Sequence, residues 1–161
     1  MLSSVVTYKT ARDRLFGAAA WADGFALFAG GQNAGGVIGT SEKYRFADDA
    51  IQVGTSLGTA RSWLAGAGNT TVGVFAQGTT NGLDSGKIST TERYTFATDG
   101  VAAGQDMVEN VFGSAAAGNS TVGIWAGGQD TFAITRTRKY TYATDLQGPG
   151  TNLAGSAVKA F

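Results

Sequence analysis

The sequence predicts an all-β fold made of internal repeats. Of its 161 residues, 25 are glycine and one is proline, while charged residues make up only 15%. Glycine at this level weakens helices, while the valine, threonine and aromatic residues of the chain favour strands. Two motifs also return at intervals of about 50 residues, and such a period indicates a repeat architecture. These observations argue against a compact helical or α/β domain.

The first motif is a polar turn, then a short apolar run, then glycine. Its copies lie at 23–31, 68–78 and 118–128. The apolar run has the composition of a strand, and the glycines fall where the chain must bend. Phe28 and Phe75 align with Trp125 in this run, so we expect Trp125 to lie in the core.

The second motif is more regular and covers 41–49, 91–99 and 137–145. Two aromatic residues alternate in each copy, so they share one face of a strand. An aspartate then opens a turn, where its side chain can hydrogen-bond the following backbone. With the first motif, each copy offers about four short strands. We assign a structural role in the repeat to Tyr44, Phe46, Asp49, Tyr94, Phe96, Asp99, Tyr140, Tyr142 and Asp145.

The order of these motifs resembles the kelch repeat. The resemblance rests on the glycine pairs in 29–31 and 126–128 and on the Ser-Glu-Lys-Tyr and Thr-Glu-Arg-Tyr segments that begin at Ser41 and Thr91. It covers roughly residues 11–158, although the tryptophan that usually follows the tyrosine motif is absent. The resemblance implies four-stranded blades of a β-propeller. The alternatives are a trimeric β-prism and a β-solenoid.

The aligned copies divide the chain into three repeats, at 11–59, 60–108 and 109–149. An N-terminal strand at 1–10 precedes them, and a partial repeat at 150–161 closes the ring or forms a subunit interface. Closed propellers have about four to eight blades, so three blades leave unpaired edges. We expect homo-oligomerisation, most simply two chains in one six-bladed ring. The other reading is a fragment of a longer propeller, although we favour an intact short protein.

Composition narrows the function. The formal net charge is zero, so no basic surface for nucleic acid or an anionic membrane is expected. The sequence shows neither a secretory signal nor an apolar run long enough to span a membrane. Because cysteine and histidine are both absent, we expect no metal, no cofactor and no enzyme activity. Arg12 and Arg61 are expected to act as struts within or between blades.

Candidate contact residues lie in turns and variable loops. Trp21 falls in a long turn, and Trp63 aligns with Arg14 and Gly113, so both are candidates for exposed aromatics at a sugar or a subunit contact. The loops that differ most between copies would carry partner specificity. The candidate ligand or partner contacts are Trp21, Trp63, Asn81, Leu83, Asp84 and Asp130.

The function expected from the sequence is that of a non-catalytic, self-assembling structural or protein-interaction module. Its composition resembles that of phage virion or tail components, so other virion proteins are possible partners and a virion is a possible location. The alternative is a small multivalent lectin that binds glycans. A lectin should repeat its ligand-facing aromatics in every copy, whereas Trp21 and Trp63 occur once each, which favours the structural module.

Overall fold

The computed structural model describes residues 14, 15 and 17–155, and in these the chain is all-β, as the composition predicts. These residues contain no α-helix and one short 3₁₀ turn, η1 (Asp84–Gly86). The N-terminal strand expected at 1–10 and the arginine at position 12 lie outside the described residues. No helix in the described part of the chain has the length and apolar character needed to cross a membrane.

Three antiparallel four-stranded sheets make up the fold, each formed by consecutive segments of the chain. Sheet 1 contains β1 (Ala18–Ala22), β2 (Phe25–Ala29), β5 (Ser41–Arg45) and β6 (Ala50–Gly54). Sheet 2 contains β7 (Ala65–Gly68), β8 (Val72–Ala76), β9 (Thr91–Thr95) and β10 (Gly100–Ala103). Sheet 3 contains β11 (Ala115–Gly118), β12 (Val122–Ala126), β13 (Thr137–Thr141) and β14 (Leu146–Pro149). A small hairpin of β3 (Gln32–Asn33) and β4 (Gly36–Val37) extends from sheet 1.

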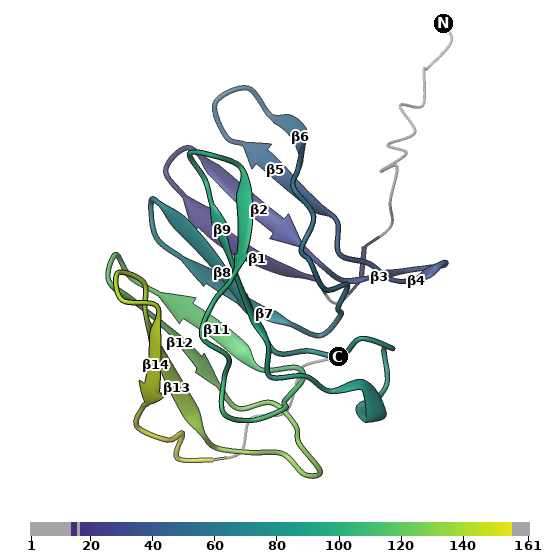
Figure 1. Ribbon diagram of the computed structural model, residues 1–161, viewed down its shortest axis with the longest axis vertical. Helices are drawn as coiled ribbons and strands as arrows, with labels where there is room; N and C mark the ends of the chain where they lie inside the picture. The colour runs from purple at the N-terminus through teal and green to yellow at the C-terminus, as the bar shows by residue number, and fades with distance from the viewer. Residues whose placement is uncertain (1–13, 16, 156–161) are drawn as a thin grey trace, which may run out of the picture.

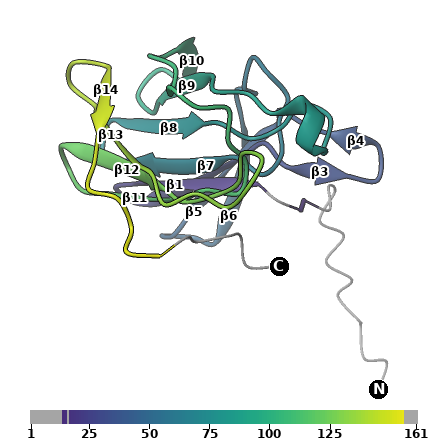
Figure 2. The same ribbon diagram turned by 90° about the horizontal axis from the view of Figure 1, so that it is seen from below.

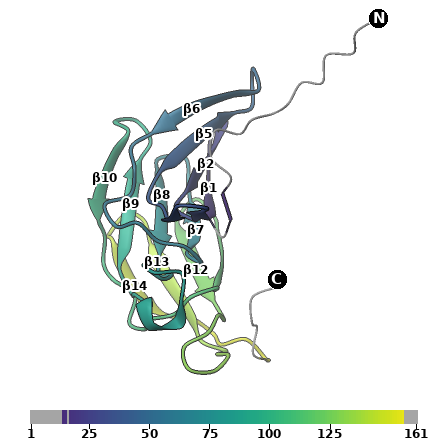
Figure 3. The same ribbon diagram turned by 90° about the vertical axis from the view of Figure 1, so that its right-hand side faces the viewer.

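The sheets follow one another as in a fan, from purple and blue sheet 1 to green and yellow sheet 3 (Figure 1). Neighbouring sheets touch through their first strands, because β7 contacts β1 on one side and β11 on the other. Figure 3 shows sheet 2 running from β10 at the left to β7 at the right. The described residues do not close into a ring. Sheet 2 lies in the middle, and sheets 1 and 3 are the two ends of the series.

This order explains how the central strands are buried. All five residues of β8 are buried, because sheet 2 is covered on both faces. A strand covered on both faces is expected to read as a continuous apolar run, and β8 does so. The equivalent strands β2 and β12 alternate between buried and more exposed residues. Each of these two strands therefore has one face in the core and one face turned away from it.

The first strands approach each other closely enough to require glycine. A Cβ atom at Gly66 of β7 would lie 2.7 Å from the carbonyl oxygen of Ala19 on β1. Since no side chain fits at that distance, glycine at this position permits the contact between sheets 1 and 2. Glycine, which argued against helices in the sequence, therefore also allows neighbouring sheets to pack closely.

Candidate interaction surfaces

Aromatic and aliphatic side chains fill the junction between sheets 1 and 2. Phe75 of β8 and Tyr94 of β9 are fully buried there and cluster with Leu27 of β2. The Tyr94 hydroxyl accepts a hydrogen bond of 3.3 Å from the backbone N–H of Thr55, which follows β6. Tyr94 therefore places its ring in the core and its hydroxyl at the backbone of the neighbouring sheet.

Sheets 2 and 3 meet through the equivalent residues. Trp125 of β12 and Tyr140 of β13 are buried and cluster with Val74 of β8. The Trp125 indole N–H donates a hydrogen bond of 3.2 Å to the carbonyl oxygen of Ala65 on β7. Trp125 lies in the core, as expected from its alignment with Phe75. The two internal junctions are thus built from the same positions of successive repeats.

Ion pairs cross both junctions at equivalent positions. Lys43 of β5 pairs with Asp99 at 2.5 Å, and Arg93 of β9 lies 3.8 Å from Asp145. In both pairs the cation precedes the tyrosine of the second motif, and the carboxylate comes from the end of that motif in the next repeat. The sequence predicted turn-forming aspartates that bond to the following backbone. The structure directs the carboxylates of Asp99 and Asp145 to the preceding sheet.

The aspartates also have an unusual backbone conformation. Asp49, Asp99 and Asp145 have φ values of 57°, 57° and 56°. This left-handed conformation is uncommon for residues other than glycine but is several-fold enriched for aspartate and asparagine. The first of the three, Asp49, accepts a hydrogen bond from the hydroxyl of Tyr44 in its own repeat. The repeated aspartate therefore both forms the turn and offers a carboxylate to a neighbour.

Sheet 1 turns an apolar face away from sheet 2. Strand register places Trp21, Phe28, Tyr44, Ile51 and Val53 on this face. Phe28 is 42% exposed, whereas its equivalents Phe75 and Trp125 are 0% and 1% exposed. Trp21, Ile51 and Val53 are more exposed still, and Phe46 beside Tyr44 is also exposed. We call this surface the leading face.

The outer face of sheet 3 is the one whose equivalents in sheets 1 and 2 pack against the next sheet. Register places Ala115, Ala117, Ile124, Lys139 and Leu146 on it. Ile124 is 39% exposed, whereas Leu27 and Val74 at the equivalent positions of sheets 1 and 2 are both 0% exposed. Ala115, Ala117 and Leu146 are exposed as well. We call this surface the trailing face.

A third surface is formed by the variable loops at one end of the sheets. Lys87 joins two of these loops, because its ammonium group lies 2.9 Å from Asp84 and 3.2 Å from Asp130. Hydrogen bonding to Asp84, and secondarily to Asp130, raises the pKa of Lys87. The β3–β4 hairpin lies on the same side as η1 (Figure 2). A Cβ at Gly82 would lie 2.9 Å from the side-chain oxygen of Gln32 in that hairpin.

Two more sequence candidates belong to this loop surface. The side-chain oxygen of Asn81 accepts hydrogen bonds of 2.9 Å from the Leu83 N–H and the Thr79 hydroxyl, so Asn81 shapes the loop. Leu83 itself is exposed. Of the six candidate contact residues, the structure therefore brings Asn81, Leu83, Asp84 and Asp130 to one end. Trp21 lies elsewhere: it belongs to strand β1 on the leading face, so its expected place in a turn is wrong.

Trp63, expected to be an exposed aromatic, is half-buried and packs edge-on against Phe112 at 6.4 Å. Its sequence alignment with Arg14 is wrong. Arg14 donates to the carbonyl oxygens of Gly30 and Thr40, as Arg61 does to those of Gln77 and Thr90, so Arg14 is the structural equivalent of Arg61. The first two copies are offset by 47 residues here instead of 49, and the same offset relates Phe28 to Phe75.

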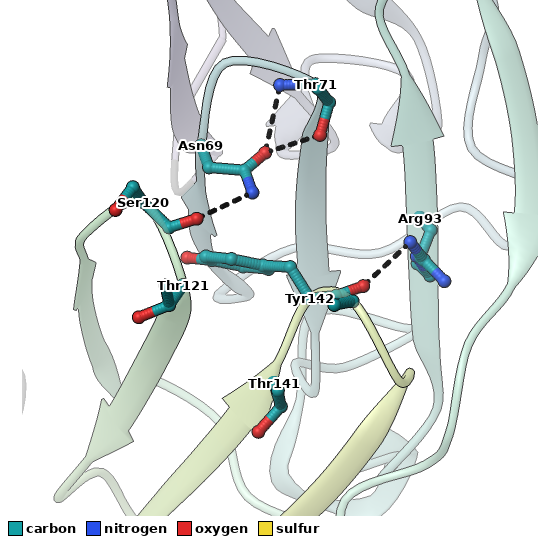
Figure 4. A pocket seen from close by; sticks show the side chains of 8 residues that line it. Asn69, Thr71, Arg93, Ser120, Thr121, Thr141 and Tyr142 are labelled. Carbon is teal, nitrogen blue, oxygen red and sulfur yellow. Dashed lines mark hydrogen bonds between the residues drawn. The ribbon is translucent and has the colours of Figure 1, made fainter.

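A cleft of about 420 Å³ lies between the hairpin ends of sheets 2 and 3 (Figure 4). Asn69 donates to the backbone oxygen of Ser120 at 3.0 Å, and Arg93 donates to that of Tyr142 at 3.1 Å. These polar groups of the lining thus bond to one another across the junction. Burial raises the pKa of Tyr142 from its ordinary value of 10.0 to about 12, so its hydroxyl stays protonated further into alkaline pH.

The chain has no histidine or cysteine, the usual partners of a nucleophilic serine or a transition metal. Among residues 14, 15 and 17–155, no three acidic side chains come together to hold a metal ion. The chain matches no known family model, and no curated protein sequence matches it.

Proposed function

We propose that this protein is a non-catalytic structural or protein-interaction module that assembles with itself through the outer faces of its first and last sheets. The observation that carries this proposal is the exposure of residues whose equivalents are buried in the internal junctions. Phe28 is 42% and Ile124 39% exposed, while Phe75 and Val74 are both 0% exposed. Contiguous exposed apolar patches mark interaction sites in soluble proteins.

The kelch-like order of the motifs supports a ring. Each sheet corresponds to one blade, the first strands β1, β7 and β11 form the inner edge, and the chain contributes three blades. A second copy brings the number to six, within the usual range of about four to eight. Closure covers both outer faces, whereas the part of a single copy that the structure describes leaves both exposed. The assembled ring then displays the loop surface of each copy on one side.

Absolute mass in solution tests this proposal. Light scattering behind a sizing column should give a species of twice the 16.4 kDa chain mass, or a larger closed assembly, over a range of protein concentrations. Replacing Phe28 by Asp should shift that species toward the monomer, because a charge would then lie in the apolar contact. A monomer at all concentrations contradicts the proposal.

A further inference from the structure

Three features of the outer faces define how one copy meets the next. The first is the apolar match between leading and trailing faces. In the internal junctions, Leu27 or Val74 of one sheet packs in the cluster that holds Tyr94 or Tyr140 of the next. The outer faces present the two halves of such a cluster separately, with Ile124 on sheet 3 and Tyr44 on sheet 1. The leading face therefore carries the same kind of residues that pack against the equivalents of the trailing face in the internal junctions.

The second feature is a divided ion pair. Lys43 and Arg93 each pair with the aspartate of the following sheet. Lys139 holds the same position in sheet 3, is exposed, and makes no ion pair with any described residue. Asp49 holds the aspartate position in sheet 1, and no described cation pairs with it. The series of pairs therefore leaves the cation of Lys139 on the trailing face and the carboxylate of Asp49 at the leading face.

The third feature is a glycine at the end of each sheet. A Cβ at Gly54 would lie 2.7 Å from the hydroxyl of Tyr94, and one at Gly104 would lie 2.6 Å from that of Tyr140. Each tyrosine thus reaches over a glycine of the preceding sheet. Gly150 follows sheet 3 at the same place, and its nearest neighbours are atoms of Thr137. The equivalent tyrosine is Tyr44, on the leading face.

We propose that the trailing face of one copy binds the leading face of a second copy head to tail, with Lys139 paired to Asp49 of the second copy and Tyr44 of that copy over Gly150. This proposal rests on the self-assembly proposed above and specifies which faces meet. The contact is heterologous, so two copies related by a two-fold axis form two identical junctions and close the ring. A symmetric contact of two leading faces would leave Lys139 outside the interface.

One residue makes the junction between copies differ from the internal ones. Trp21 of β1 pairs with Ala26 on the leading face. The equivalent pairs of the other two sheets consist of glycine alone, Gly68 with Gly73 and Gly118 with Gly123. The internal junctions are narrow at this end, since a Cβ at Gly68 would lie 3.2 Å from the Trp21 carbonyl oxygen. The junction between copies is therefore wider near β1, where the indole fills the additional space.

Charge reversal with mixing tests the pairing. Lys139→Asp places two carboxylates in both junctions, and Asp49→Lys places two cations there, so each variant alone should dissociate with a Kd raised about ten- to hundredfold. Mixing the two variants should restore the dimer, because both junctions of the mixed pair then carry opposite charges. Asp84→Lys, on the loop surface, changes the net charge as Asp49→Lys does and should leave the mass unchanged.

The outcomes separate the two proposals. A wild-type protein that is monomeric at all concentrations overturns self-assembly. A wild-type oligomer that neither single reversal weakens leaves self-assembly standing and overturns the head-to-tail pairing. An oligomer weakened by the single reversals but not restored in the mixture also overturns the pairing. Circular dichroism of each variant verifies that the fold is retained.

Discussion

The guanidinium group of Arg61 is fully buried, and its Nη2 atom lies 2.7 Å from Oε2 of Glu92. Arg61 also donates to the carbonyl oxygen of Thr90 at 2.6 Å, while Glu92 accepts from the backbone N–H of Gly58 at 2.6 Å. Burial lowers the pKa of Arg61, and Glu92 opposes that shift. The pair therefore ties the start of the second repeat to β9.

Removing one partner of this pair should be costly. We expect Glu92→Ala to lower the free energy of unfolding by about 3–5 kcal/mol, because a buried guanidinium is left without its counter-ion. Urea unfolding measures the change. The matched control is Glu42→Ala, since Glu42 lies 3.5 Å from Arg14 with 29% of its side chain exposed. That variant should lose less than about 1 kcal/mol, and equal losses would contradict the account.

The buried tyrosines are expected to be core residues. Tyr94→Ala should cost about 3–5 kcal/mol, because it empties a site between two sheets. Tyr94→Phe keeps the ring and removes only the hydroxyl that Thr55 bonds to, so it should cost about 1 kcal/mol. Thermal or urea unfolding compares the two. An unchanged stability of Tyr94→Ala would mean that the ring does not fill the junction.

Tyr142 should make the fold sensitive to strong alkali. Burial raises its pKa to about 12 from the ordinary value of 10.0, so the folded state resists its ionisation. The stabilisation from keeping the phenol neutral is complete below pH 10 and is lost as the pH rises to about 12. The difference in unfolding free energy between wild type and Tyr142→Phe should therefore fall across this window. A difference that stays constant from pH 9 to about 12 would contradict the shift.

The outer faces should control assembly without supporting the fold of one chain. We expect Ile124→Asp to reduce the fraction of oligomer, because it places a carboxylate in the apolar contact, and to change the stability of the dissociated chain by less than about 0.5 kcal/mol. Leu83→Asp makes the same kind of change at an exposed residue of the loop surface. Sedimentation velocity should show that only the first variant dissociates. Equal behaviour of the two would place the interface elsewhere.

The sequence predicts the strands well because alternation is a local property. Tyr94 and Phe96 share a face whatever lies next to them, and the all-β class follows from composition. The sequence does not reveal which face has a neighbour. Phe28 and Phe75 occupy the same position of their repeats, but only the second has a sheet to cover it. The kelch-like ring stays a proposal, because a pattern of strands does not fix how many sheets come together.

Contacts between repeats were harder to predict for the same reason. The sequence assigns the carboxylates of Asp99 and Asp145 to their own turns, since their partners Lys43 and Arg93 lie 56 and 52 residues away in the chain. The third repeat also reverses a charge. Arg138 pairs with Glu109, which lowers the pKa of Glu109, where sheet 2 has Glu92 paired with Arg61. Arg138 is aligned with Glu92, but the residue aligned with Arg61 is Val111 and not Glu109, so the signal in the sequence was the loss of the arginine at Val111 together with the arginine at position 138.

Chemical crosslinking tests the head-to-tail junction most directly. The chain has no cysteine, so two introduced thiols are the only ones that a short bismaleimide can join. The internal control is the variant with Lys43→Cys and Asp99→Cys. It should crosslink within one chain and therefore form no covalent dimer. Lys139→Cys with Asp49→Cys should give a covalent dimer that carries two links. The account is contradicted if the control pair reacts while the second pair yields only single chains under conditions where the wild type is dimeric.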